Sequence, residues 1–299
     1  MEKTNYKKKK NYLFIGIVIT VLIVYCLLMF TMVYLTINTS LKEQVEYDID
    51  KLTHQSFSLT NSFWIKNYTE AFSAFAVPIR GNTYKVLLFE MLINSFIYAG
   101  GCAVMATIVP ALVAYLLAKY KQRFNSVIYT TVIVAMVLPI VGSLPSEIQM
   151  AKSLGLYNTR FGVVVLKSTY LGMYFLIFHG TFKGLSDEYI EAARIDGAGQ
   201  FSIMLRVVFP LVKTTIFAVI LLNFINYWNE YQTPLIYMSD YPTAAVGLYK
   251  AVWMPGDSGR TDQPIQMAGC MILFIPIFIL FIAFKDIFMG NLTVGGIKG

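Results

Sequence analysis

The sequence predicts an all-α, polytopic membrane protein with six transmembrane helices. Of its 299 residues, 57% are hydrophobic and 14% are charged, whereas a soluble domain contains roughly 45–50% apolar and about 25% charged residues. Its mean hydropathy is +0.60, and uncharged runs of about 20 residues, the length that crosses a bilayer, recur along the chain. Because lipid offers the backbone no hydrogen-bonding partner, we expect each span to be helical.

The six expected spans follow one another along the chain. They cover residues 12–37, 91–118, 124–146, 161–182, 213–238 and 263–284. The first run is longer than the apolar part of a cleaved signal peptide, about 7–15 residues, and no A-x-A site follows it, so we expect a retained helix. The fourth run is interrupted by Lys167, and the fifth contains Glu230.

Basic residues predict the orientation of these spans. Lysines occupy positions 7–10 before the first span, and Lys119, Lys121 and Arg123 follow the second. Because cytoplasmic loops carry an excess of Lys and Arg, both termini are expected in the cytoplasm. The chain then divides into a cytoplasmic N-terminus with the first helix (1–37), an extracytoplasmic loop (38–86) and a five-helix core (87–299). The cytoplasmic parts of this core are a loop at 183–209 and a tail at 285–299. The loop at 38–86 is polar with scattered aromatic residues, and it either packs as a small cap or only connects two spans.

Several classes of chemistry lack their motifs. The two histidines stand in no zinc-binding pattern, the Gly-Lys dipeptide of a Walker A loop never occurs, and no G-x-S-x-G sequence is present. Cys26, Cys102 and Cys270 lie in apolar runs without metal-ligand spacing, so we interpret them as packing residues. We therefore expect no catalytic residue, no metal ligand and no cofactor bound by this chain. The basic residues gather at the ends of spans, which favours a membrane over nucleic acid as the partner of the +7 net charge.

The most informative segment is the loop at 183–209. Ser186 is a suitable N-cap for a helix whose first turn is acidic. We expect Gly197 to end this helix, since glycine adopts positive φ without strain. A second helix follows, with apolar residues at i, i+3, i+4 and i+7, namely Phe201, Met204, Leu205 and Val208. From the residues alone, both an amphipathic connector at the membrane surface and a docking element for another protein fit this segment.

The spacing within this loop resembles a family signature. Glu191-Ala192-Ala193, then Gly197, then Val207, Phe209 and Pro210 resemble the EAA signature of binding-protein-dependent ABC importer permeases. The resemblance implies a type I ABC importer permease fold. It also implies that the loop couples the chain to an ATPase through Glu191, Ala192, Ala193, Arg194, Asp196, Gly197 and Pro210.

Two further stretches are similar to the carbohydrate, maltose-permease-like branch of that family. Trp228-Asn229-Glu230-Tyr231 followed by Pro234-Leu235 resembles its pattern in the fifth span, and the last nine residues, 291–299, resemble its glycine-rich tail. With these stretches the resemblance extends over about residues 66–299. It implies that the tail contacts the ATPase subunits through Gly295, Gly296 and Lys298.

The resemblance implies a machine of several subunits. The expected partners are a homologous second permease, two ATPase subunits that use ATP and Mg, and an extracytoplasmic binding protein that delivers a sugar or oligosaccharide. The chain itself is then expected to be a non-catalytic, multi-pass subunit in the cytoplasmic membrane of a prokaryote, working by alternating access. Two alternatives stay open, which are the same importer carrying a non-sugar solute and a membrane scaffold subunit.

The fifth span supplies candidates for the translocation path. Asn223, Tyr227 and Glu230 share one helical face at i, i+4 and i+7, and Trp228 adds a neighbouring aromatic surface. Amides and aromatic rings suit an uncharged sugar. Glu230 lies in an otherwise uncharged run, where a carboxylate is a functional candidate. It either lines the path or orders a helix break before Pro234.

Overall fold

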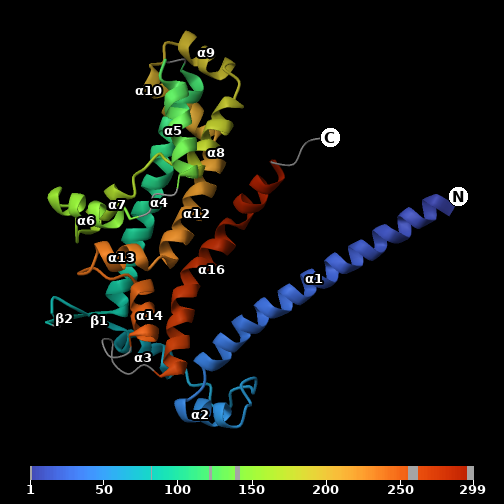
Figure 1. Ribbon diagram of the computed structural model, residues 1–299, viewed down its shortest axis with the longest axis vertical. Helices are drawn as coiled ribbons and strands as arrows, with labels where there is room; N and C mark the ends of the chain where they lie inside the picture. Colours follow the sequence, from blue (N-terminus) through green and yellow to red (C-terminus); the bar gives the residue numbers. More distant parts are fainter. Residues whose placement is uncertain (1, 82, 121–122, 139–141, 255–261, 295–299) are drawn as a thin grey trace.

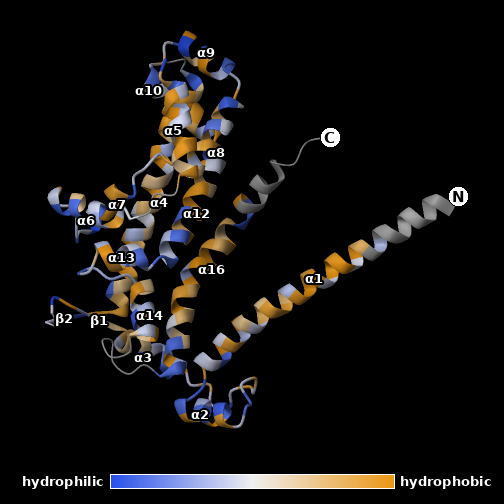
Figure 2. Cartoon of the chain, in the orientation of Figure 1, coloured by the Kyte–Doolittle hydropathy of each residue, from blue (hydrophilic) through white to orange (hydrophobic). Residues whose placement is uncertain are grey.

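The computed structural model describes residues 2–81, 83–120, 123–138, 142–254 and 262–294. The molecule is elongated and mostly helical, with α9 (Glu188–Ile195) at one end and α2 (Gln44–Leu52) at the other (Figure 1). Hydrophobic residues run along the long helices, whereas hydrophilic residues gather at the α9 and α2 ends (Figure 2). This distribution is that of a chain whose middle lies in lipid and whose two ends meet water.

Three predicted spans are single long helices. They are α1 (Glu2–Ser40), α4 (Leu88–Lys119) and α16 (Gln263–Val294), and each is long and apolar enough to cross a bilayer. α4 is the central one, because it packs against both α8 (Met173–Lys183) and α12 (Lys213–Asn229). α1 instead leaves the body of the molecule and contacts α16 at one end (Figure 1).

The other three predicted spans consist of broken rather than continuous helices. The third contains α5 (Asn125–Val137) and leads to α6 (Leu144–Ser153), and the fourth contains α7 (Arg160–Leu166) and α8. The fifth divides into α12 and α13 (Gln232–Tyr237). Pro234 explains this last break, because it has no N–H to donate to the carbonyl of Glu230.

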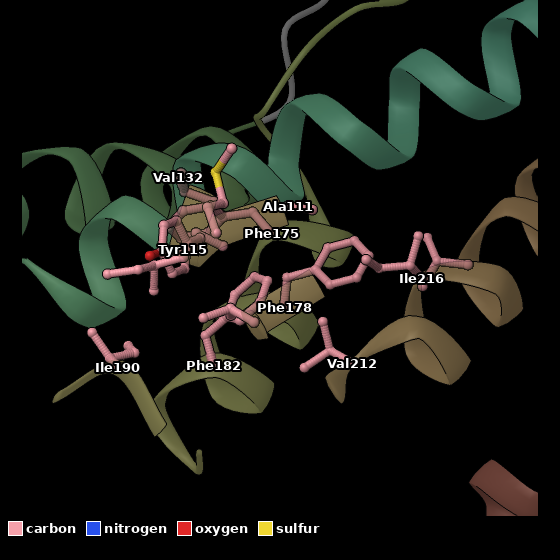
Figure 3. Packing of buried hydrophobic residues seen from close by; sticks show 14 residues of the cluster. Ala111, Tyr115, Val132, Phe175, Phe178, Phe182, Ile190, Val212 and Ile216 are labelled. Carbon is pink, nitrogen blue, oxygen red and sulfur yellow. The ribbon is translucent and has the colours of Figure 1, made fainter. Parts of the chain in front are cut away.

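The α9 end is built on an aromatic core. Buried side chains from α4, α5, α8 and α12 meet there with residues of the short helices α9, α10 (Gln200–Ile203) and η1 (Met204–Val208), a π-helical stretch. Figure 3 shows Phe178 and Phe182 of α8 lying between Tyr115 of α4 and Val212, which precedes α12. A loop between two spans is thereby packed against the helix ends.

A second core lies at the α2 end. It joins α3 (Lys66–Ala74) to α4, α14 (Ala244–Trp253) and α16 through apolar residues such as Phe75, Met91 and Leu273. Gly269 of α16 permits the close approach, since a Cβ there would lie 2.3 Å from the Phe75 ring. The expectation of an all-α chain misses a small hairpin beside this core. Its strands β1 (Ala76–Ile79) and β2 (Tyr84–Leu87) pair antiparallel, with Val77 opposite Val86.

The hairpin has a local cause. β-branched and aromatic residues flank the turn, and these residue types favour strands. Within the turn, Arg80 and Gly81 both adopt positive φ, 50° and 65°, as hairpin turns commonly require.

The segment between α1 and α3, which includes α2, folds into a small cap at this end of the molecule. A buried ion pair joins Lys42 to Asp50 of α2. The Asn67 side chain donates hydrogen bonds to the carbonyls of Ser40 and Lys42, at 2.9 and 2.8 Å. Asn38 donates to the Ser58 carbonyl at 2.7 Å. We call residues 38–67 the polar cap, since hydrogen bonds rather than apolar packing order them.

Candidate functional site

The segment carrying the EAA-like spacing forms a helix, a sharp turn and a second helix, as its residues predict. α9 ends at Ile195, and Gly197 turns the chain with φ of +83°. No heavy atom lies within 4 Å of a Cβ built on Gly197. The glycine is therefore required by its backbone conformation and not by lack of space.

α9 presents one face to the aromatic core and the other to the outside. Ile190 is buried and Ala193 packs against the core. Glu191, Ala192, Arg194 and Asp196 are exposed. The two alanines expected to act together thus have different roles, because only Ala192 is available to a second protein.

Polar contacts fix this segment to the end of α4. Lys119 Nζ donates to the Leu185 carbonyl at 2.7 Å and to Asp187 Oδ1 at 2.6 Å, and the Lys119 side chain is only 5% exposed. The Tyr120 hydroxyl donates to the side chain of Gln200. The segment is thereby held to a long transmembrane helix on both sides of its turn.

The chain bends sharply where the segment joins the fifth span. The helical stretch 200–211 and α12 meet at 76°. Pro210 lies in α11 (Phe209–Leu211), directly before this bend, and η1 precedes it. A proline cannot continue the helical hydrogen-bond ladder, and π-helical turns often accompany functional sites. We call residues 204–212 the elbow.

Large apolar side chains stand exposed on the outer surface of this segment. Ile195 is 87% exposed and Phe201 is 70% exposed. Exposed apolar residues beside charged ones are typical of an interaction surface. We define Glu191, Ala192, Arg194, Ile195 and Phe201 as the docking surface, because charged and large apolar side chains stand exposed together on it.

A cavity of about 470 Å³ lies between α4, α12 and the break before α8. Asn223 and Tyr227 line it, as the helical spacing predicts, together with Tyr170 and Tyr174. The Asn223 amide donates to the Thr107 hydroxyl of α4 at 3.1 Å. Among the described residues, no charged side chain lines this central cavity.

Trp228 lies on a different face from these residues. It is 1% exposed, its Nε1 donates to the Leu273 carbonyl of α16 at 3.1 Å, and its ring packs against Phe96 and Phe224. Trp228 therefore links α12 to α16 and does not line the central cavity.

Glu230 lies at the break between α12 and α13 and gathers partners that the sequence analysis missed. Its Oε2 accepts a hydrogen bond from the Tyr98 hydroxyl at 2.7 Å, and the Thr233 hydroxyl donates to Oε1. Lys167, from the break between α7 and α8, lies 3.9 Å from Oε1. In the sequence, Lys167 within the fourth span was the signal that could have predicted this pair, because an ammonium within a membrane span needs a carboxylate partner.

Two further expectations concern the C-terminal tail and metal binding. Gly295, Gly296 and Lys298 of the expected ATPase-contacting tail lie outside the described residues. Across the part of the chain that the structure describes, no group of three or more His, Cys, Asp or Glu side chains is placed to hold a metal ion.

Residues 106–293 match the family described as binding-protein-dependent transport system inner membrane component. The chain belongs to this family. The match includes the docking surface, the elbow, the central cavity and Glu230, and it confirms the resemblance noted in the EAA-like spacing. The chain is therefore a membrane component of a transport system.

Several named permeases are similar to this chain. The melibiose/raffinose/stachyose import permease protein MelC of Bacillus subtilis is 27% identical over 270 residues, covering 89% of this chain and 90% of that protein. The arabinooligosaccharides transport system permease protein AraQ of Halalkalibacterium halodurans is 29% identical over 66% of this chain and 69% of its own length. The sn-glycerol-3-phosphate permease UgpE of Yersinia enterocolitica is 31% identical over 61% of this chain and 64% of its own length.

The fold is also similar to a solved structure. A chain from the crystal structure of a bacterial ABC transporter involved in the import of the acidic polysaccharide alginate superposes with a TM-score of 0.68. The similarity covers 91% of this chain and 95% of that chain at 22% sequence identity. This comparison supports the overall fold, because the similarity spans nearly the whole of both chains.

Proposed function

We propose that this chain is a translocation subunit of an ATP-driven importer of neutral sugars or oligosaccharides, working by alternating access. The main support for this proposal is that the docking surface, the elbow and the cavity-lining helix α12 follow one another directly along the chain. A docking surface at the α9 end connects through the elbow to α12, and α12 lines a cavity whose mostly apolar wall carries a few polar groups. A push on the docking surface can thus move a wall of the cavity.

The choice of a neutral sugar rests on the lining of the central cavity. An amide, tyrosine rings and the Thr169 hydroxyl line it, and such groups pair with sugar hydroxyls and stack on sugar rings. The names of MelC and AraQ, which specify oligosaccharides, agree with this choice. UgpE supports a second candidate, a glycerol phosphate, but an anion would require a cationic lining. Uptake of raffinose and of glycerol 3-phosphate by the same reconstituted importer separates the two.

The partners follow from surfaces that the chain leaves open. We assign the docking surface to one of two ATPase subunits, which would bind ATP and Mg; this chain supplies no bond chemistry. α1 is exposed along its apolar length, so we assign a homologous second permease to the space beside it. An extracytoplasmic binding protein would deliver the sugar to the polar cap end. A membrane scaffold would need neither the cavity nor the elbow.

The coupling role has a direct test in the matched alanines of α9. Ala192→Trp places a bulky wedge at the centre of the docking surface while leaving the core intact, so we expect ATPase subunits to dissociate and transport to stop. Co-purification of the ATPase subunits and binding-protein-stimulated ATP hydrolysis measure this. Ala193→Trp, which enters the aromatic core of the chain itself, should lower thermal stability instead. Glu191→Ala, a change at the rim, should have a milder effect. Full ATPase retention by Ala192→Trp would contradict the proposal.

We further propose a cytoplasmic-membrane location with both termini inside and the polar cap outside. Leu59 is 71% exposed on the cap, and Glu188 is exposed on α9. In intact cells, a membrane-impermeant thiol reagent should label Leu59→Cys and spare Glu188→Cys, while opened membranes should allow both. Labelling of Glu188→Cys alone would reverse the orientation.

A further inference from the structure

A second cavity, of about 180 Å³, lies beside the central cavity. We call it the outer cavity. Its lining combines polar and apolar side chains from α6, α7 and α13 and from the break after α7. They are Glu147, Met150, Val163, Leu166, Lys167, Thr233 and Tyr237.

The two cavities lie in series along the fifth span. Asn223 and Tyr227 of α12 line the central cavity, whereas Thr233 and Tyr237 of α13 line the outer one. In the orientation proposed above, the fifth span runs outward from the elbow, so the outer cavity is nearer the binding protein. Glu230 lies between the two pairs of residues along the chain.

A polar cluster lies at the breaks of the fourth and fifth spans, where residues lining one cavity are followed along the chain by residues lining the other. Glu230 accepts hydrogen bonds from Tyr98 and Thr233, and Thr233 and Lys167 both line the outer cavity. Thr169, two residues after Lys167, lines the central cavity. The Lys167–Glu230 pair thus joins the break in the fourth span to the break in the fifth. We call these two residues the partition.

The lining of the outer cavity suits hydroxyl groups. The Tyr237 hydroxyl donates to Glu147 Oε2 at 3.3 Å, and Lys167 Nζ lies 3.9 Å from Glu230 Oε1, beyond hydrogen-bond distance. A carboxylate and an ammonium with unused hydrogen-bonding capacity pair with the donors and acceptors of a sugar. Glu147 and Lys167 contribute one carboxylate and one ammonium to the lining, and Glu230 lies beside the lysine, so an anionic ligand would gain little.

We propose that the outer cavity is an entry subsite for a single ring of a neutral sugar. Its volume lies below the roughly 300–1,000 Å³ of pockets for drug-sized ligands, and the central cavity is more than twice as large. One ring of an oligosaccharide therefore occupies the outer cavity first. The partition then opens, and the oligosaccharide moves on into the central cavity. This inference rests on the proposed import of neutral sugars.

Protection of an introduced thiol tests the subsite. Met150 lines the outer cavity and is 49% exposed, whereas Leu154, just after α6, is 62% exposed and does not line it. Cys26 and Cys270 are first changed to alanine, and Cys102 is buried. The complete importer in liposomes is then labelled with a methanethiosulfonate reagent during ATP turnover. Raffinose-loaded binding protein should slow labelling of Met150→Cys at least threefold relative to sugar-free binding protein, and should leave Leu154→Cys unchanged.

A second measurement follows the sugar moved per ATP hydrolysed. Glu147→Gln keeps the size of the side chain and removes the charge, so we expect this ratio to fall several-fold while stimulated ATP hydrolysis continues. Glu90→Gln, an exposed carboxylate on α4, is the matched control and should keep the native ratio.

The outcomes separate the two claims. Uptake of raffinose or melibiose by the native importer, with equal labelling rates at Met150→Cys and a native ratio for Glu147→Gln, overturns the subsite alone. Uptake of glycerol 3-phosphate but of neither sugar overturns the proposed function and the subsite with it. Protection confined to Met150→Cys supports both.

Discussion

The docking segment and the polar cap, which lie at opposite ends of the molecule, are held together by different interactions. The docking segment, residues 186–212, includes the docking surface and the elbow and rests on close-packed aromatic rings. The ring centroid of Phe182 lies 5.6 Å from that of Tyr115 and 6.2 Å from that of Phe209. The polar cap at the other end rests on hydrogen bonds and on a buried ion pair between Lys42 and Asp50. Packed rings resist deformation, whereas a charged network depends on the protonation of its carboxylates.

This difference suits the role proposed for each end. An end that receives a push must transmit it without yielding, and a close-packed core of rings interlocked between α4, α8 and α11 meets that need. An end that meets a partner in the surrounding medium needs a defined surface and less stiffness. The comparison predicts that substitutions at the α9 end abolish coupling, while acid affects the polar cap first.

Phe182→Ala should have the largest effect. The side chain is fully buried among rings from three helices, so its removal leaves a cavity that costs about 3–5 kcal/mol. We expect a lower thermal midpoint in detergent and loss of the ATPase subunits. Phe124→Ala removes an exposed ring at the same end and should change stability by no more than about 0.5 kcal/mol. Equal midpoints for the two variants would show that the rings do not support the docking segment.

Gly197→Val should have the next largest effect. Valine at a φ of +83° introduces backbone strain of about 1–3 kcal/mol, which misplaces the docking surface. Gly199→Val is the matched control, because Gly199 has a φ of −69° and open space around it. Transport and ATPase co-purification should fall only for Gly197→Val. The same loss in both variants would mean that the turn is sensitive to bulk and not to φ.

Acid should loosen the polar cap with the smallest effect on the rest of the chain. Hydrogen bonds from Lys42 and Ser58 hold the pKa of Asp50 below its ordinary value. For Glu46, burial raises the pKa, but hydrogen bonds from Ser62 and Asn61 outweigh it and leave the pKa lowered. Groups with depressed pKa values stabilise the fold above their unfolded pKa, near 4, and lose that contribution as pH falls through the lowered values.

Hydrogen exchange, corrected for intrinsic rates, measures this acid effect. Protection of residues 44–67 should be constant from about pH 7 to 5 and fall below about pH 4, while α4 stays protected. Asp50→Asn should reduce protection at neutral pH and flatten its pH dependence. A cap that remains protected at pH 3 would remove the proposed contrast between the two ends.

The sequence predicted the α9 end well because the determinants there are local. An acidic first turn, a glycine turn and an apolar stretch lie within about twenty residues, and the structure places Gly197 in the expected conformation. Asn223 and Tyr227 were found for the same reason, since helical spacing alone puts them on one face. The hairpin was missed, although Arg80-Gly81 between β-forming residues was an available signal.

The expected N-cap was wrong, because Asp187 precedes α9 and Ser186 only accepts a hydrogen bond from the Glu188 N–H at 3.3 Å. Of the expected apolar face, Met204 and Val208 are buried, whereas Phe201 and Leu205 are exposed.

The rest depended on contacts between distant parts of the chain. Glu230 bonds to Tyr98, 132 positions away, and Trp228 bonds to the carbonyl of Leu273. No local pattern reports such partners, so Trp228 was grouped with the path because it adjoins Tyr227. The break at 167–172 was hidden for a similar reason, since hydropathy records apolar length and not continuity of the helix. The break at 230–231 was one of the two interpretations left open for Glu230, because Pro234 follows it.

The elbow makes α12 a lever. Its 17 residues span about 26 Å at 1.5 Å per residue, so a rotation of about 10° at the elbow displaces the far end by roughly 4–5 Å. Glu230 lies at that far end, 3.9 Å from Lys167. A small tilt of α12 at the elbow would therefore be enough to separate the two charges. A slight movement at one membrane surface would thereby open the contact between Lys167 and Glu230 at the opposite end of α12.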